Sequence, residues 1–176
     1  MTQHITPTAE ESAKIAELMQ ASFPVTVSSI AKALGCDELT AAQKMPETAV
    51  RFVTGDVVEK FDDLWAELAS WEKVTLFLIH GGHVFEIAAK LSTGKRAQGY
   101  YNILAKDTVV GGHIRYEEFA ACAFMTMPFM GRESHSVQFF AKDGSVSFSV
   151  YVGRENHKLI ESVVAAFQAA KEKFCA

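Results

Sequence analysis

The feature that most constrains this chain is a change in the spacing of its apolar residues at about Val74. Before that point apolar residues recur every three or four positions, as in residues 61–71, which predicts helices. After it they alternate, and helical spacing returns only near the C-terminus. The alternating segments are VTLFLIH, HVFEIAA, YYNIL, VVGGHI, FAACAFMTM, SVQFFAK and SVSFSVYVG. This order predicts an α+β fold, with a mostly antiparallel sheet flanked by helices.

Two pairs of turn residues predict how neighbouring strands are joined. Asp143-Gly144 suits a two-residue hairpin turn that would pair Phe139 with Phe148 and Ala141 with Val146.

The last helix is predicted to begin near Asn156, which is a common capping residue.

Gly81-Gly82 suits a similar turn, which would bring His80 opposite His83. Two imidazoles so placed could share a metal or bracket a planar ligand. They could equally form a polar pair at an exposed tip, or separate onto opposite faces if the glycines form a bulge.

Three short helices are predicted before the sheet, over residues 8–20, 28–34 and about 37–44. We therefore expect a helical N-terminal segment (1–46) followed by a sheet domain (47–176). The second and third helices resemble a helix-turn-helix over residues 25–44, which keeps a DNA-binding regulator as an alternative. Residues 1–75 carry 6 Lys and Arg against 12 Asp and Glu, however. An acidic surface repels phosphates, so a helical cap is the preferred interpretation and no nucleic-acid partner is expected.

The expected compartment follows from the cysteines and the N-terminus. The three cysteines are scattered and odd in number, which argues against a disulfide framework and favours a reducing cytoplasm. MTQHITPTAEE does not have the pattern of a signal peptide, and no apolar run approaches the roughly 20 residues of a membrane span. We expect a cytoplasmic protein without membrane insertion.

The segment GYYNILAKDTVVGGHIR holds the strongest candidates for a functional site. Tyr100 and Tyr101 head one predicted strand and point to opposite faces, so only one of them can face a given pocket. His113 follows Gly111-Gly112, and glycines in strands often let a ligand approach closely. Ordinary structural interpretations also exist for both: a histidine hydrogen-bonded at a strand start, and tyrosines packed with their hydroxyls at a rim.

The order of motifs resembles that of one known family. WEKVTLFLIHGGHVFEI, LSTGKRAQGYYNIL, GGHIRYEEF, FMGRESHSVQFFAKDGS and YVGRENHKLI occur in the order and spacing of the HutX/ChuX family of intracellular haem-utilisation proteins. The resemblance extends from about Phe61 to the C-terminus, and more weakly over the helical front. It implies the HemS/ChuX-like fold and a homodimer paired through its sheets. It also implies a carrier that binds haem (heme b) non-covalently and passes it to a haem-degrading or storage protein. A haem-degrading enzyme with the same pocket is the alternative.

The resemblance implies a haem site residue by residue. The haem-linked histidine of the family falls on His113, and Tyr100 matches a tyrosine that could bind iron as a phenolate. A second family histidine falls on Ile79, where this chain departs from the pattern, and His83 could substitute for it. The residues assigned to haem binding are His113, Tyr100, His80, His83, Tyr101, Arg115 and Arg132. Further candidates are the cations Lys95 and Arg96 and the apolar residues Phe77, Phe85, Met125, Met127 and Phe129.

Overall fold

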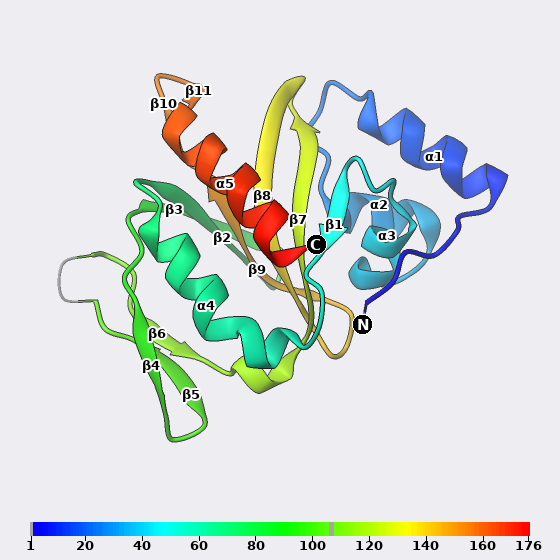
Figure 1. The fold of residues 1–176 in the computed structure, drawn as a ribbon. Helices are drawn as coiled ribbons and strands as arrows, with labels where there is room; N and C mark the ends of the chain where they lie inside the picture. The colour runs from blue at the N-terminus through cyan, green and yellow to red at the C-terminus, as the bar shows by residue number, and fades with distance from the viewer. Residues whose placement is uncertain (1, 106–107) are drawn as a thin grey trace.

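The computed structural model describes residues 2–105 and 108–176 and confirms the α+β fold (Figure 1). The helices are α1 (Ala9–Met19), α2 (Val27–Leu34), α3 (Glu38–Lys44), α4 (Val57–Ser70) and α5 (Glu161–Phe174), with a 3-10 turn, η1, at Tyr116–Glu118. The strands are β1 (Val50–Phe52), β2 (Val74–His80), β3 (His83–Ala89), β4 (Gly94–Ala97), β5 (Tyr100–Ile103), β6 (Gly112–Ile114), β7 (Phe119–Phe129), β8 (Arg132–Ala141), β9 (Val146–Val152), β10 (Arg154–Glu155) and β11 (Lys158–Leu159). None of the helices in the described residues is long and apolar enough to span a membrane.

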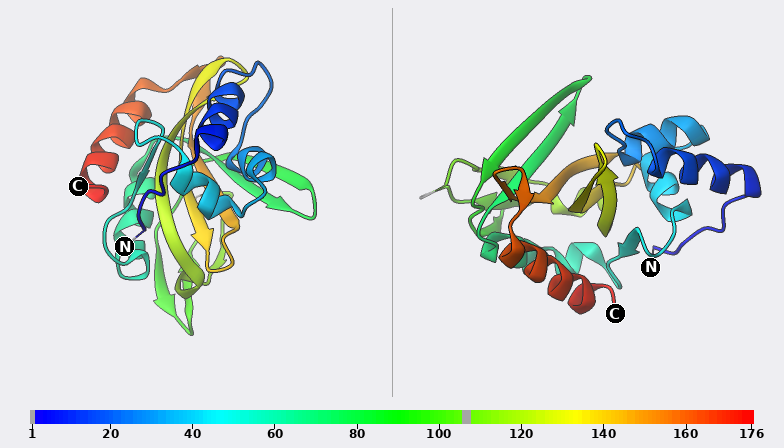
Figure 2. Two further views of the ribbon diagram at one scale, coloured as in Figure 1. Left: turned by 90° about the vertical axis from the view of Figure 1, so that its right-hand side faces the viewer. Right: turned by 90° about the horizontal axis from the view of Figure 1, so that it is seen from above.

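Six antiparallel strands form the main sheet, in the order β1-β7-β8-β9-β2-β3. Helices α4 and α5 lie on one side of it and α1–α3 on the other (Figure 2). The first side holds a core around Phe61, Trp65 and Phe139. The second side holds a separate core that includes Met45 and Phe140. The N-terminal helices therefore bury apolar surface against the same sheet as α4 and α5.

The β8–β9 hairpin contains a bulge near its turn. Phe139 pairs with Phe148 as predicted, but Phe140 rather than Ala141 pairs with Val146, because the register shifts by one residue. Only Gly144 of the predicted Asp143-Gly144 turn has a positive φ, of 84°. The connection is thus a longer turn with a bulge, and not the predicted two-residue turn.

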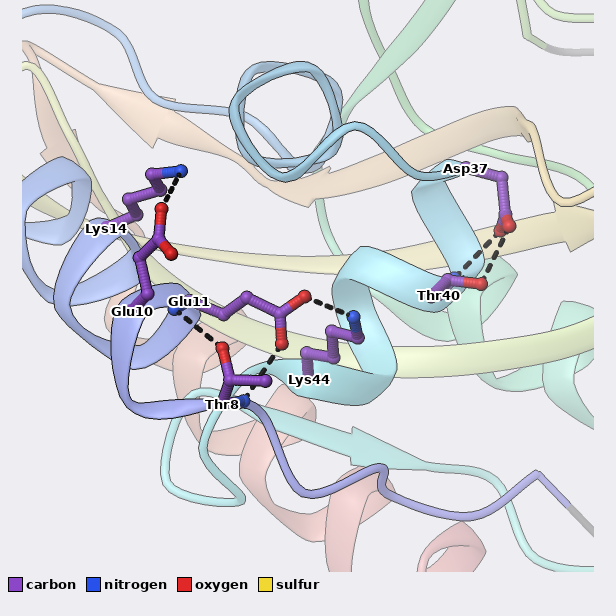
Figure 3. A network of polar contacts seen from close by, with 7 residues as sticks. All are labelled: Thr8, Glu10, Glu11, Lys14, Asp37, Thr40 and Lys44. Atoms are coloured by element: carbon purple, nitrogen blue, oxygen red, sulfur yellow. Dashed lines mark hydrogen bonds and ion pairs between the residues drawn. The ribbon is translucent and has the colours of Figure 1, made fainter.

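Contacts between α3 and this hairpin support the longer turn and join the N-terminal helices to the main sheet. The amide of Leu39 donates to the carbonyl of Gly144, and a methyl group at Gly144 would lie 2.5 Å from the carboxylate of Asp37. Asp37 caps α3, and Glu11 of α1 binds Lys44 of α3 at 2.5 Å (Figure 3). The helix that a DNA-binding interpretation would place in a groove is thus fixed to the sheet through the β8–β9 turn.

Strands β2 and β3 have the predicted bounds and form a hairpin that projects from the body of the protein (Figure 2). Gly81 and Gly82 both have positive φ, and His80 pairs with His83, so the predicted two-residue turn is confirmed. We call residues 74–89 the β2–β3 arm. Its outer part exposes large apolar side chains on both faces, including Val84 (54%) and Phe85 (59%). It is therefore an unusually apolar surface feature.

The C-terminal helix begins later than its sequence predicts. Asn156 and His157 have φ values of 48° and 64° and form the turn between β10 and β11, so Asn156 does not cap a helix. Helix α5 begins five residues later, at Glu161. Asn favours both helix caps and left-handed turn positions, and here the turn prevails.

Candidate functional site: a tyrosine–histidine platform

The segment singled out by the sequence forms a second, three-stranded sheet in the order β4-β5-β6. Asn102 of β5 lies opposite Lys95 of β4 on one side and opposite His113 of β6 on the other. Strand β4 was missed by the sequence patterns because it is short and polar. It can pack closely because of Gly94, where a Cβ atom would lie 2.2 Å from the carbonyl oxygen of Asn102.

The two tyrosines at the head of β5 face opposite sides, as predicted. Tyr101 is only 2% exposed, and its ring packs edge-on against Phe61 at 5.2 Å. Its hydroxyl accepts a hydrogen bond from the Gly94 amide at 2.8 Å. Burial raises the pKa of the Tyr101 phenol above its usual value. Tyr101 is thus part of the core, and its predicted contact with haem does not fit this position.

Tyr100 is 38% exposed and shares the open face of the small sheet with His113. The centroids of the two rings lie 6.0 Å apart with the rings nearly perpendicular. Asn102 lies between them in the register, and its side chain binds His113. We call the open face formed by Tyr100, Asn102 and His113 the platform.

Hydrogen bonds of Asn102 fix the protonation pattern of His113. The side-chain nitrogen of Asn102, Nδ2, donates to the backbone carbonyl oxygens of Lys95, Ala97 and Tyr100 at 3.1–3.3 Å. Its Oδ1 therefore faces His113 Nδ1, at 2.6 Å, and can only accept, so Nδ1 carries the proton. In a neutral imidazole this leaves a lone pair on Nε2, which is the atom that a metal ion would bind. Sequence reasoning missed Asn102, although its two-residue spacing from Tyr100 places it on the same face.

The predicted cations are spread over different parts of the surface. Arg115 follows β6 and lies 3.6 Å from Glu118, with most of its side chain exposed. Arg96 binds Asp62 at 2.6 Å and stacks over Tyr116, so it supports the fold. Arg132 lies at the β7–β8 turn, at the opposite end of the protein from β4–β6 (Figure 1).

The other predicted site residues are also separate from the platform. His80 and His83 lie at the exposed tip of the β2–β3 arm. Met125 and Met127 are buried in the core beneath α1–α3, so they do not line a slot with Phe77 and Phe85. Phe77 lies on the α2 side of the main sheet, where its ring is 4.5 Å from that of Tyr151.

The platform is an open surface and not a closed cavity. A cavity of about 700 Å³ lies between α1, α3 and the N-terminal residues and does not include Tyr100 or His113. No three His, Cys, Asp or Glu side chains of residues 2–105 and 108–176 converge as metal ligands. The platform thus presents two groups with the chemistry of metal ligands, an imidazole nitrogen and a phenol oxygen.

The fold and the platform together define an α+β protein that presents an imidazole–phenol pair on an open sheet face. Residues 54–170 match the model of the haem utilisation family ChuX/HutX. The chain is 32% identical over 161 residues to the intracellular heme transport protein HutX of Vibrio cholerae. The aligned region covers 91% of this chain and 82% of that protein. The chain belongs to the ChuX/HutX family.

Solved structures support the same fold. The structure of the heme-binding protein ChuX matches with a TM-score of 0.77 and 25% identity, over 89% of this chain and 96% of that chain. ChuS, a heme oxygenase from E. coli, matches with a TM-score of 0.72 at 14% identity, over 95% of this chain but only 50% of its own length. At that identity the second likeness shows the fold alone. The predicted HemS/ChuX-like fold is confirmed.

Proposed function

We propose that this protein is an intracellular haem carrier that binds haem b non-covalently and does not degrade it. Its similarity to the heme transport protein HutX and the heme-binding protein ChuX supports this proposal. The observation that carries it is the hydrogen bond between His113 Nδ1 and Asn102 Oδ1, which leaves Nε2 free to bind a metal beside Tyr100 on an accessible surface. An open platform also suits a carrier, because cargo bound there can be loaded and released without opening the fold.

In this proposal His113 is the first iron ligand and Tyr100 is the second candidate. Lys95 and Arg115 lie near enough in the small sheet to serve the haem propionates, since Lys95 is opposite Asn102 and Arg115 follows β6. Arg132, at the far end of the main sheet, is not included.

Haem titration of matched variants tests this assignment. We expect His113→Ala to remove most of the Soret shift, and Tyr100→Phe to change the spectrum or weaken binding. Tyr101→Phe is the matched control, because it also removes one phenol from β5. That variant leaves the Gly94 amide without its acceptor, so it should cost about 1–3 kcal/mol of stability while leaving haem binding unchanged. Unchanged binding in both His113→Ala and Tyr100→Phe would refute the platform as the haem site.

A carrier and a degrading enzyme make opposite predictions for the haem-loaded protein in air. With an electron donor present, the Soret band of a carrier persists after allowance for free haem. A band that decays into biliverdin-like absorption, with release of iron, would instead favour the enzymatic alternative.

We further propose that the protein acts as a homodimer and passes its haem to a degrading or storage protein. The β2–β3 arm supports a dimer, because Ile79 and Val84 on one face and Leu78 and Phe85 on the other are exposed. The arm also carries His80 and His83, which a second copy could bring to its partner's haem. Light scattering should show a dimer for the native chain and a monomer for Phe85→Glu. A native monomer would contradict the dimer while leaving haem binding by the platform intact.

A further inference from the structure

Two tight turns meet at the end of the main sheet that lies away from the platform. One joins β7 to β8 through Met130 and Gly131, and the other joins β10 to β11. Between them is a cavity of about 350 Å³. We call it the arginine corner, and its lining residues are Phe129, Met130, Arg132, Arg154 and His157. It includes the FMGR and GRENH motifs, which the platform leaves without a role.

The positive charge of the arginine corner is not neutralised within the described part of the chain. Arg154 donates to the backbone carbonyl oxygens of His157 and Glu133, not to a carboxylate. Arg132 forms no ion pair among the described residues. The nearest acid in the sequence, Glu133, turns its carboxylate to His135, 2.7 Å away. Two guanidinium groups and an imidazole therefore line one cavity without a carboxylate in it.

The environment of Arg154 agrees with this description. Partial burial, and secondarily the charge of Arg132, lower the pKa of the Arg154 guanidinium below its usual value. An arginine stays protonated at physiological pH even so, and the repulsion between two such groups is relieved by an anion between them.

Two residues at the arginine corner have positive φ values, which residues with a Cβ atom rarely adopt. Met130 and His157 have φ values of 53° and 64°, which cost a residue with a Cβ atom about 1 kcal/mol or more each. Glycine would remove this cost at either position. Both residues lie in two-residue hairpin turns, which favour positive φ, and the turns place an apolar side chain and an imidazole on the rim of the basic cavity.

We propose that the arginine corner binds a small oxyanion, a carboxylate or a phosphate, attached to an apolar body. The two arginines supply charge-assisted hydrogen bonds to the oxyanion, and Phe129 and Met130 supply an apolar wall for the body. The site is independent of the proposed haem platform, which lies at the other end of the molecule (Figures 1 and 2).

Titration of the haem-free protein with three probes tests this inference. Inorganic phosphate, phenyl phosphate and benzoate are each added while the amide resonances of Gly131 and His157 are followed by NMR. We expect these resonances to shift with saturation, and phenyl phosphate to bind more tightly than inorganic phosphate because of the apolar wall. Benzoate binding without phosphate binding would identify a carboxylate as the ligand, and the reverse result a phosphate.

Matched variants make the result specific to the arginine corner. Arg132→Gln should weaken binding about tenfold or more, since it removes one charge-assisted contact without touching the hydrogen bonds of Arg154. Lys142→Gln removes an exposed cation at the other end of β8 and should change binding less than about twofold. Absence of saturable shifts with all three probes, or equal affinity of native protein and Arg132→Gln, would overturn the proposal. Haem titration of Arg132→Gln should match the native protein, so the two proposed sites can fail separately.

Discussion

Replacing Asn102 tests the central feature of the proposed haem site, because this side chain determines which nitrogen of His113 is free. In Asn102→Ala the imidazole loses its acceptor at Nδ1, 2.6 Å away, and can rotate or move its proton to Nε2. Either change removes the lone pair from the open face of the platform. His113 itself stays in place on β6, so the variant alters orientation and tautomer and not the number of possible ligands.

The size of the effect follows from the bonds that are lost. A net hydrogen bond is worth about 1 kcal/mol, and loss of a partner that orients a metal-binding histidine typically lowers affinity about 10- to 100-fold. The platform is partly exposed, and water can replace some of the lost interaction, so we expect the lower end, about tenfold weaker haem binding. The three carbonyl oxygens of the β4–β5 hairpin would also lose their shared donor.

Asn102→Asp separates orientation from support of the hairpin. A carboxylate still accepts from His113 Nδ1 but cannot donate to the three carbonyl groups. We expect it to lower stability while keeping haem affinity near or above the native value. The assay combines haem titration with ¹⁵N NMR of the histidine side chains, which distinguishes the two tautomers without haem. The reasoning is refuted if Asn102→Ala keeps both the Nδ1–H tautomer and the native affinity while His113→Ala loses binding.

Three further variants test the fold that supports these sites. Gly94→Ala should separate β4 from β5, because the new methyl group would lie 2.2 Å from a carbonyl oxygen. Proteolysis within the small sheet should then be faster than in the native protein, and an equal rate of cleavage in both proteins would contradict this. Burial lowers the pKa of His135 in the folded protein. As the pH falls below about 6.5, the imidazole is therefore protonated in the unfolded state before it is protonated in the folded state, and the free energy of unfolding should decrease. Denaturant unfolding should show this slope, and His135→Gln should flatten it; an equal slope in both proteins would contradict the assignment. Met130→Gly should raise the midpoint of thermal unfolding by relieving about 1 kcal/mol of strain, and a lower midpoint would be the contrary result.

The sequence predicts elements well where local pattern and tertiary structure agree. The β2–β3 hairpin has the predicted bounds because strict alternation is interrupted by two glycines that can both adopt positive φ. The turn at Asp143-Gly144 differs because α3 packs against it. A distant helix is not encoded in the residues of the turn, so the Asp-Gly pair alone predicts the shorter connection.

The candidate site was predictable in its parts but not in its arrangement. Alternation places Tyr100 and Tyr101 on opposite faces, and burial of Tyr101 agrees with this pattern. Pairing of β5 with β6 brings Asn102 to His113, and such a pairing across ten intervening residues has no local signal. The positions of Arg132 and Met125 depend on the topology of the main sheet, so residue type alone could not predict that they lie away from the platform.

The opposite directions of Phe139 and Phe140 on β8 have a consequence for how this fold can vary. Consecutive residues of a strand point to opposite faces, so Phe139 and Phe140 enter different cores and the sheet separates two interiors that share only a backbone. Changes beneath α1–α3 can then accumulate without disturbing the aromatic packing around Phe61. The helical cap can diversify, or acquire a new partner, while the layer that supports β4–β6 keeps its shape.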